Sequence, residues 1–277
     1  MKFLRLYKYR FWNKYTLLNS MILMFILVFS YFMYNERLQM LIQSIWERPG
    51  DLHPDAYKSF ILLNLEGVLT WEYFVMYSMF NMALIFPLFS ILPCIPFTKD
   101  LHSYFIYGKH RFANLKKQYW FTITQYASIV TITVTVSMAF IFTIAGFFSV
   151  PSLTSLGSID TWLPEGFYSE YPYIVFMFMI FCYYGSMIFS YALLTLGLAL
   201  WTNRVYILPI AVYLFFVVQT RIAIYFNLPY LDIQANIVAY NTTVPLWQMY
   251  VSILFVAFMA VIIIYFGIKK ISKEHLV

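Results

Sequence analysis

Six long apolar runs with almost no charge dominate this sequence of 277 residues. A helix needs about 20 apolar residues to cross a hydrocarbon core about 30 Å thick, so each run is a candidate membrane span. Only 11% of the residues are charged, against about a quarter in a soluble domain. We therefore predict an all-α polytopic membrane protein that forms a single transmembrane domain over residues 1–277. The predicted spans are residues 17–35, 73–97, 119–150, 172–202, 205–226 and 246–268.

Basic residues lie mainly on one side of these spans. All but four of the 18 Lys and Arg residues fall in segments 1–16, 98–118 and 269–277 or at Arg204. Short loops rich in Lys and Arg stay in the cytoplasm, so we expect both termini to be cytoplasmic, with 269–277 as a tail. The net charge of +6 thus indicates orientation and not nucleic-acid binding. The expected location is the plasma membrane, in a bacterium.

Residues 1–16 alternate basic and aromatic side chains. Helical spacing brings Leu4, Tyr7, Phe11 and Tyr15 to one face, which is typical of an interfacial helix in contact with membrane lipids. This amphipathic helix is either a basic anchor that fixes topology or a lever that couples the spans to a cytoplasmic partner.

Segment 98–118, TKDLHSYFIYGKHRFANLKKQ, has the pattern of a structured cytoplasmic element. Thr98 can cap a short helix, Gly108 can end it, and a second basic helix then leads into the third span. Its aromatic residues, among them Tyr104 and Tyr107, either lie in the headgroup layer or belong to a surface that contacts another protein.

This topology resembles the permease subunits of ABC-2 type (type V) transporters over essentially the whole chain. The shared features are an amphipathic helix before span 1, six spans with both ends inside, and a cytoplasmic helical turn between spans 2 and 3. In that family this loop has an acidic residue, a helix, a turn followed by basic residues, and a lysine before span 3. The matching residues here are Asp100, Tyr107 and Gly108, Lys109 and Arg111, and Lys116 or Lys117.

The resemblance implies that two permease bundles enclose a pathway and that cytoplasmic ABC ATPase subunits dock beneath them. The second bundle would be another copy of this chain or a homologous permease. The sequence has no phosphate-binding GxxxxGK[ST] loop, because Gly108 and Lys109 are followed by His110 and lack the upstream glycine. We therefore expect no enzyme activity and no cofactor in this chain, with ATP and Mg bound by the partner. The predicted ATPase-coupling residues are Lys99, Asp100, Tyr104, Tyr107, Gly108, Lys109 and Arg111.

Polar residues inside the spans are candidates for the cargo pathway. One helical face of span 3 has four hydroxyl side chains beside Gln125. They are Thr124, Ser128, Thr131 and Thr135. Such a stripe either contacts cargo or packs helices and bonds backbone carbonyls. Asn81 in span 2 is a second candidate, since an amide in hydrocarbon normally faces a partner or a wet cavity. In the same span, Pro87, Pro93 and Pro96 predict bending.

The predicted function is export of an amphipathic or hydrophobic cargo, such as a peptide, an antimicrobial or a lipid-like molecule. The 25 Tyr and 29 Phe residues are compatible with an aromatic-lined cleft for it. The alternative is a non-transporting membrane protein of the immunity or sensor type. All four His residues lie outside the predicted spans, so we expect neither catalytic residues nor a metal site.

Overall fold

The structure, a computed structural model, describes residues 13–46, 53–105, 114–150, 164, 166–202, 204–237 and 245–274. Throughout these ranges the regular structure is helical, apart from one isolated bridge between Thr70 and Val150. Six of the described helices are long and apolar enough to cross a membrane, which confirms the helical class and the six apolar span helices of the prediction. They run over Lys14–Tyr34, Trp71–Leu101, Leu115–Phe148, Pro172–Ala199, Ile207–Tyr225 and Trp247–Ser272. The side of the membrane on which each end lies stays a prediction.

The first span helix, α2 (Lys14–Tyr34), begins at a polar cap. The side-chain oxygen of Asn13 accepts hydrogen bonds from the backbone N–H groups of Tyr15 and Thr16, at 2.9 and 3.0 Å. This cap satisfies donors that the first helical turn leaves unpaired. Lys14 and Tyr15 therefore belong to the span helix and not to the interfacial helix predicted over 1–16. The rest of that prediction, residues 1–12, lies outside the described residues.

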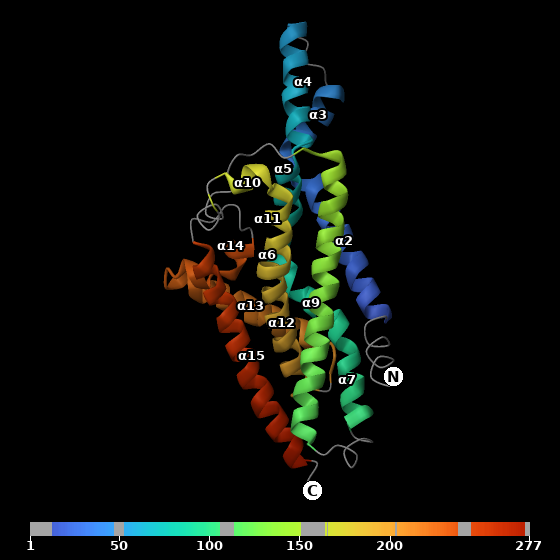
Figure 1. Ribbon diagram of the computed structural model, residues 1–277, viewed down its shortest axis with the longest axis vertical. Coiled ribbons are helices and arrows are strands. Elements are labelled where there is room, and N and C mark those ends of the chain that lie inside the picture. The colour runs from blue at the N-terminus through green and yellow to red at the C-terminus, as the bar shows by residue number, and fades with distance from the viewer. Residues whose placement is uncertain are drawn as a thin grey trace.

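A helical hairpin follows, made of α3 (Glu36–Trp46) and α4 (Pro54–Val68). It projects beyond the ends of α2 and α9 along the long axis of the molecule (Figure 1). The Tyr57 hydroxyl donates to the Ser44 carbonyl at 3.1 Å, and the Arg37 guanidinium donates to the Leu63 carbonyl at 3.3 Å. These two bonds hold α3 against α4.

The second span is a series of short helical pieces. They are α5 (Trp71–Met79), α6 (Met82–Ile85), the 3₁₀ turns η1 (Phe86–Ser90) and η2 (Leu92–Cys94), and α7 (Ile95–His102). Pro87, Pro93 and Pro96 each lie in the first turn of a piece, where the missing N–H of proline costs least. The expected bending at these prolines is confirmed.

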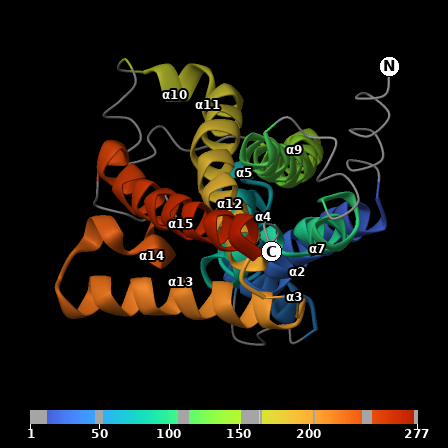
Figure 2. The ribbon, with the colours of Figure 1, turned by 90° about the horizontal axis from the view of Figure 1, so that it is seen from below.

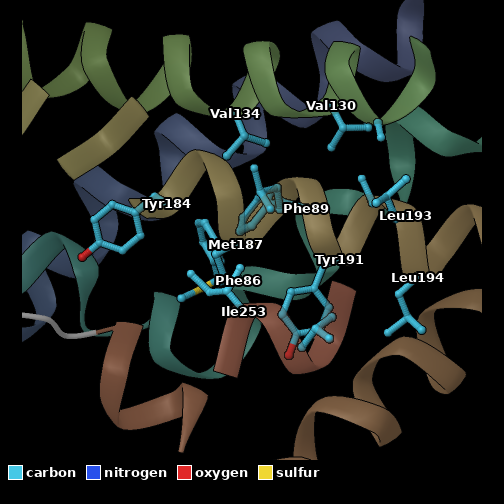
Figure 3. Close-up of a cluster of buried hydrophobic side chains, with 14 of the residues drawn as sticks. Phe86, Phe89, Val130, Val134, Tyr184, Met187, Tyr191, Leu193, Leu194 and Ile253 are labelled. Atoms are coloured by element: carbon cyan, nitrogen blue, oxygen red, sulfur yellow. The ribbon is translucent and has the colours of Figure 1, made fainter. Parts of the chain in front are cut away.

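The core forms around α12 (Gly185–Ala199), which continues α11 (Pro172–Phe178) through the π-helical turn η5 (Met179–Tyr184). Helix α12 packs on α9 (Leu115–Phe148) and on α15 (Leu246–Glu274). Figure 3 shows Met187 of α12 beside Phe86 of the broken second span, with Val134 of α9 in the same buried cluster. A short outer helix, α10 (Phe167–Glu170), precedes α11.

Helix α13 (Ile207–Tyr225) has a different direction from its neighbours. Seen from below, α9 appears end-on whereas α13 is seen along its length, so α13 lies across the long axis of the bundle (Figure 2). After it come η6 (Pro229–Leu231) and α14 (Ile233–Ile237). The hydroxyls of Tyr183 and Tyr184 donate to backbone carbonyls of α14, at 3.0 and 2.8 Å, and thereby fasten α14 to the core.

Candidate functional site

The predicted coupling segment begins inside a helix that continues the second span. Helix α7 starts at Ile95, and the Thr98 hydroxyl donates to the Ile95 carbonyl within it at 2.7 Å. The prediction that Thr98 caps a separate helix is therefore wrong, because the proline-broken span resumes as α-helix before Thr98 is reached. Of the seven predicted coupling residues, Lys99, Asp100 and Tyr104 are described. The other four lie outside the described residues: Tyr107, Gly108, Lys109 and Arg111.

Two of these three side chains are bonded to α9. The Tyr126 hydroxyl donates to the Asp100 carboxylate at 3.0 Å, and the Gln118 amide donates to the Tyr104 hydroxyl at 3.1 Å. One residue beyond Tyr104, the Phe105 ring stacks on Tyr119 of α9 with centroids 3.9 Å apart. The C-terminal end of α7 is therefore fastened to the first turns of α9.

Lys99 is the described coupling residue that remains exposed. Its ammonium nitrogen lies 5.9 Å from the centre of the Tyr15 ring at the start of α2, within the range of a cation–π contact. The start of α2, the end of α7 and the start of α9 thus meet in one place.

The hydroxyl groups of the stripe on α9 make hydrogen bonds within their own helix. Thr124, Ser128, Thr131 and Thr135 each donate to the carbonyl four residues earlier, at 2.8 to 2.9 Å. A β-carbon added at Gly185 of α12 would lie 3.4 Å from the Thr135 methyl and 3.7 Å from that of Thr131. Two members of the stripe therefore pack against α12. Gln125, which is half-buried, lies beside them on α9.

Asn81 also has a partner within the bundle. It lies between α5 and α6, and its amide nitrogen donates to the Ser30 hydroxyl of α2 at 2.8 Å. This bond ties the first span to the second at the point where the second span first breaks. The Asn81 amide therefore faces a partner side chain, and its contact with cargo stays a prediction.

The feature that the sequence did not reveal is a partly open hollow of about 280 Å³ between α2, the broken second span and α13. We call it the α2–α13 hollow. Most of its surface is aliphatic, and Phe89 is its one aromatic lining residue among those described. The lining residues are Asn19, Ile22, Ile26, Ile85, Leu88, Phe89, Ile91, Leu92 and Pro209. This hollow is therefore not an aromatic-lined cleft.

Asn19 is the polar residue of the hollow. Its side chain is fully buried, and neither its amide nitrogen nor its oxygen has a hydrogen-bond partner. Leaving a buried donor or acceptor unpaired costs about 1–3 kcal/mol, so native structures rarely contain one without a reason. The argument that singled out Asn81, an amide within an apolar run, applied equally to Asn19 and could have found it.

Other chemistry in the described residues is sparse. Among them, no three His, Cys, Asp or Glu side chains lie close enough together to hold a metal ion. At the outer end of the second span, the buried Glu72 carboxylate accepts a hydrogen bond from Tyr168 of α10 at 2.9 Å. Cys94 and Cys182 are both free thiols.

The sequence matches no protein-family model and no curated protein, and no solved structure matches the fold.

Proposed function

We propose that this chain is the permease subunit of an ABC transporter, which moves an amphipathic or hydrophobic cargo with energy from a separate ATPase. The observation that supports it best is the position of the broken helix. The second span leaves α-helical geometry after Ile85, and five residues at this break line the α2–α13 hollow: Ile85, Leu88, Phe89, Ile91 and Leu92.

Irregular backbone at membrane depth is tolerated where it is buried in protein or lines a cavity. Broken span helices with a binding site at the break are also a recurring element of transporters. A proline-rich break is a natural place for a span to change its bend. A change of bend over Ile85 to Leu92 would reshape one wall of the hollow.

The contacts between α7 and α9 support a mechanism in which movement at the cytoplasmic loop is transmitted to the lining of the hollow. Helix α7 follows η2 directly, so a displacement of the α7–α9 end moves the chain that lines the hollow. The described parts of segment 98–118, residues 98–105 and 114–118, lie at this end, and Lys99 offers an exposed positive charge there. In this proposal the ATPase acts on the 98–118 loop and two permease bundles form the complete pathway.

One observation favours the alternative, a non-transporting immunity or sensor protein. The α3–α4 hairpin exposes large apolar side chains, including Trp46 at 83% of its full exposure and Ile45 at 63%. Through such a projecting apolar hairpin, a sensor could contact the molecule that it detects outside the cell.

Co-purification separates the two functions. The chain is expressed with an ABC ATPase whose gene neighbours its own, purified, reconstituted in liposomes, and assayed for ATP hydrolysis with and without candidate hydrophobic peptides. A permease retains the ATPase and shows cargo-stimulated hydrolysis. Failure of any ATPase to co-purify would favour the sensor.

A charge reversal tests the coupling surface within that assay. Lys99→Glu should lower the stimulated hydrolysis several-fold, because it places a negative charge where the ATPase docks. Lys58→Glu is the matched control, since Lys58 is an exposed lysine on α4 of the projecting hairpin. Equal effects of the two variants, or none from either, would contradict the assignment of Lys99.

A further inference from the structure

We propose that the α2–α13 hollow binds the aliphatic chain of a molecule that carries an uncharged amide, and that Asn19 recognises this amide. The inference rests on the proposed function, because it names the class of cargo that the hollow accepts. It concerns binding to this chain alone, so it can be tested without an ATPase.

The lining of the hollow selects an aliphatic occupant. Apart from Asn19, every lining residue is apolar, and none of them carries a charge. A charged headgroup placed there would lose its hydration without gaining a partner. Hydrocarbon, in contrast, would cover the side chains of Ile22, Ile26 and Leu88 and fill space that is otherwise poorly packed.

The size of the hollow indicates that it holds part of a molecule. Pockets that enclose a whole drug-sized ligand are about 300–1,000 Å³, and this hollow, at about 280 Å³, is smaller and partly open. An extended chain fits this description, with one segment in the hollow and the remainder in the surrounding lipid or in a second bundle.

The unpaired side-chain amide of Asn19 indicates which polar group the bound molecule carries. A carboxamide side chain has two N–H donors and a carbonyl acceptor, and both ends of Asn19 lack a partner. An ester or a ketone could accept from Asn19 but could not donate to it. A primary amide on the occupant does both, because one of its N–H groups lies beside its carbonyl oxygen. Both polar atoms of Asn19 are buried, so this pairing requires the Asn19 side chain to turn toward the hollow.

The position of the hollow agrees with loading from the inner leaflet. Asn19 lies in the second turn of α2, which begins at Lys14, and Pro209 lies in the first turn of α13, which begins at Ile207. The charge pattern predicts that the start of α2 is cytoplasmic. On that prediction the hollow is on the side from which a lipid-like molecule made in the cytoplasm would enter the bundle.

The test uses the full-length chain in detergent micelles with two photoreactive probes of equal chain length, a diazirine-bearing fatty amide and the corresponding diazirine-bearing alkane. Labelling is titrated and the labelled peptides are identified by mass spectrometry. We expect both probes to label residues of α2, η1 and α13, and the amide to bind about tenfold more tightly, the effect of one to two net hydrogen bonds.

Substitutions test separately whether Asn19 recognises the amide and whether the probe occupies the hollow. Asn19→Leu should abolish the preference for the amide and leave alkane binding within about twofold. Ile26→Trp should fill the hollow and weaken both probes. Asn236→Leu is the matched control, because Asn236 of α14 is also fully buried with both side-chain atoms unpaired but does not line the hollow. It should leave the preference unchanged.

Equal binding of amide and alkane by the unaltered chain would overturn the inference, and so would an equal loss of preference in Asn236→Leu. The first of these results needs no variant, so the test holds even if a substitution prevents folding. Amide selectivity without any ATPase partner would refute only the proposed transport. Cargo-driven ATP hydrolysis without amide selectivity would refute only the role of Asn19.

Discussion

Replacing Tyr126 by phenylalanine tests whether the end of α7 is fastened to α9 as the structure shows. The substitution removes the hydroxyl that donates to Asp100 at 3.0 Å. It keeps the ring, which packs edge-on against Phe97 with centroids 5.6 Å apart. The substitution therefore removes the hydroxyl and preserves the ring packing between the two helices.

The expected cost follows from the charge and exposure of the acceptor. A hydrogen bond to a charged group contributes about 1.5–3 kcal/mol, and Asp100 is only partly buried, so the lower end applies. We expect Tyr126→Phe to lower the free energy of unfolding by about 1.5 kcal/mol, close to a tenfold change in the unfolding equilibrium constant. The measurement is an SDS titration in mixed micelles, followed by circular dichroism.

A double-mutant cycle gives the result its control. If Tyr126 and Asp100 interact, Asp100→Ala should cost about 1 kcal/mol less in the Tyr126→Phe background than in the unaltered chain. Tyr104→Phe, which removes a neutral hydrogen bond to Gln118, should cost only about 0.5–1 kcal/mol. Additive effects of the Tyr126 and Asp100 substitutions, within about 0.3 kcal/mol, would refute the proposed fastening.

Three further substitutions test the packing of the bundle, each by the same unfolding titration. Gly197→Leu should destabilise by about 1–3 kcal/mol through overpacking, because a β-carbon added there would lie 3.0 Å from the Ile264 side chain of α15. An unchanged midpoint would mean that α12 and α15 are farther apart than the structure shows. Thr131→Val should change stability by less than about 0.5 kcal/mol, since the hydroxyl donates to a carbonyl of its own helix. Under the proposed function it should also leave cargo-stimulated ATP hydrolysis intact, and a loss of that stimulation would return the stripe to the pathway. Trp71→Phe should cost about 1–3 kcal/mol, because the buried indole N–H donates to the Phe142 carbonyl at 3.1 Å, and a neutral result would contradict that bond.

Local properties of the chain predicted a large part of the fold. Hydropathy located the six span helices because crossing a membrane depends on the length and apolarity of a single segment. Pro87, Pro93 and Pro96 predicted the breaks in the second span because a missing N–H acts on the helix that contains it. The hydroxyls of span 3 had two possible roles, and their i to i−4 bonds, which are also local, support packing.

The candidate site depended on neighbours that are distant in the sequence. Asn19 and Asn81 are alike as isolated amides in apolar runs, yet Asn81 meets Ser30 across a helix interface while Asn19 is buried without a partner. Asp100, a predicted coupling residue, accepts a hydrogen bond from Tyr126 of α9, a partner that its local sequence does not indicate.

By itself, then, the sequence determined that this chain forms six apolar helices with a proline-broken second span, because helix formation and hydrophobicity act within a segment. Only the tertiary structure decided which polar groups are satisfied and where a hollow remains. Hydrogen-bond partners and packing defects arise when helices meet, and the α2–α13 hollow with Asn19 on its wall exists only between three of them.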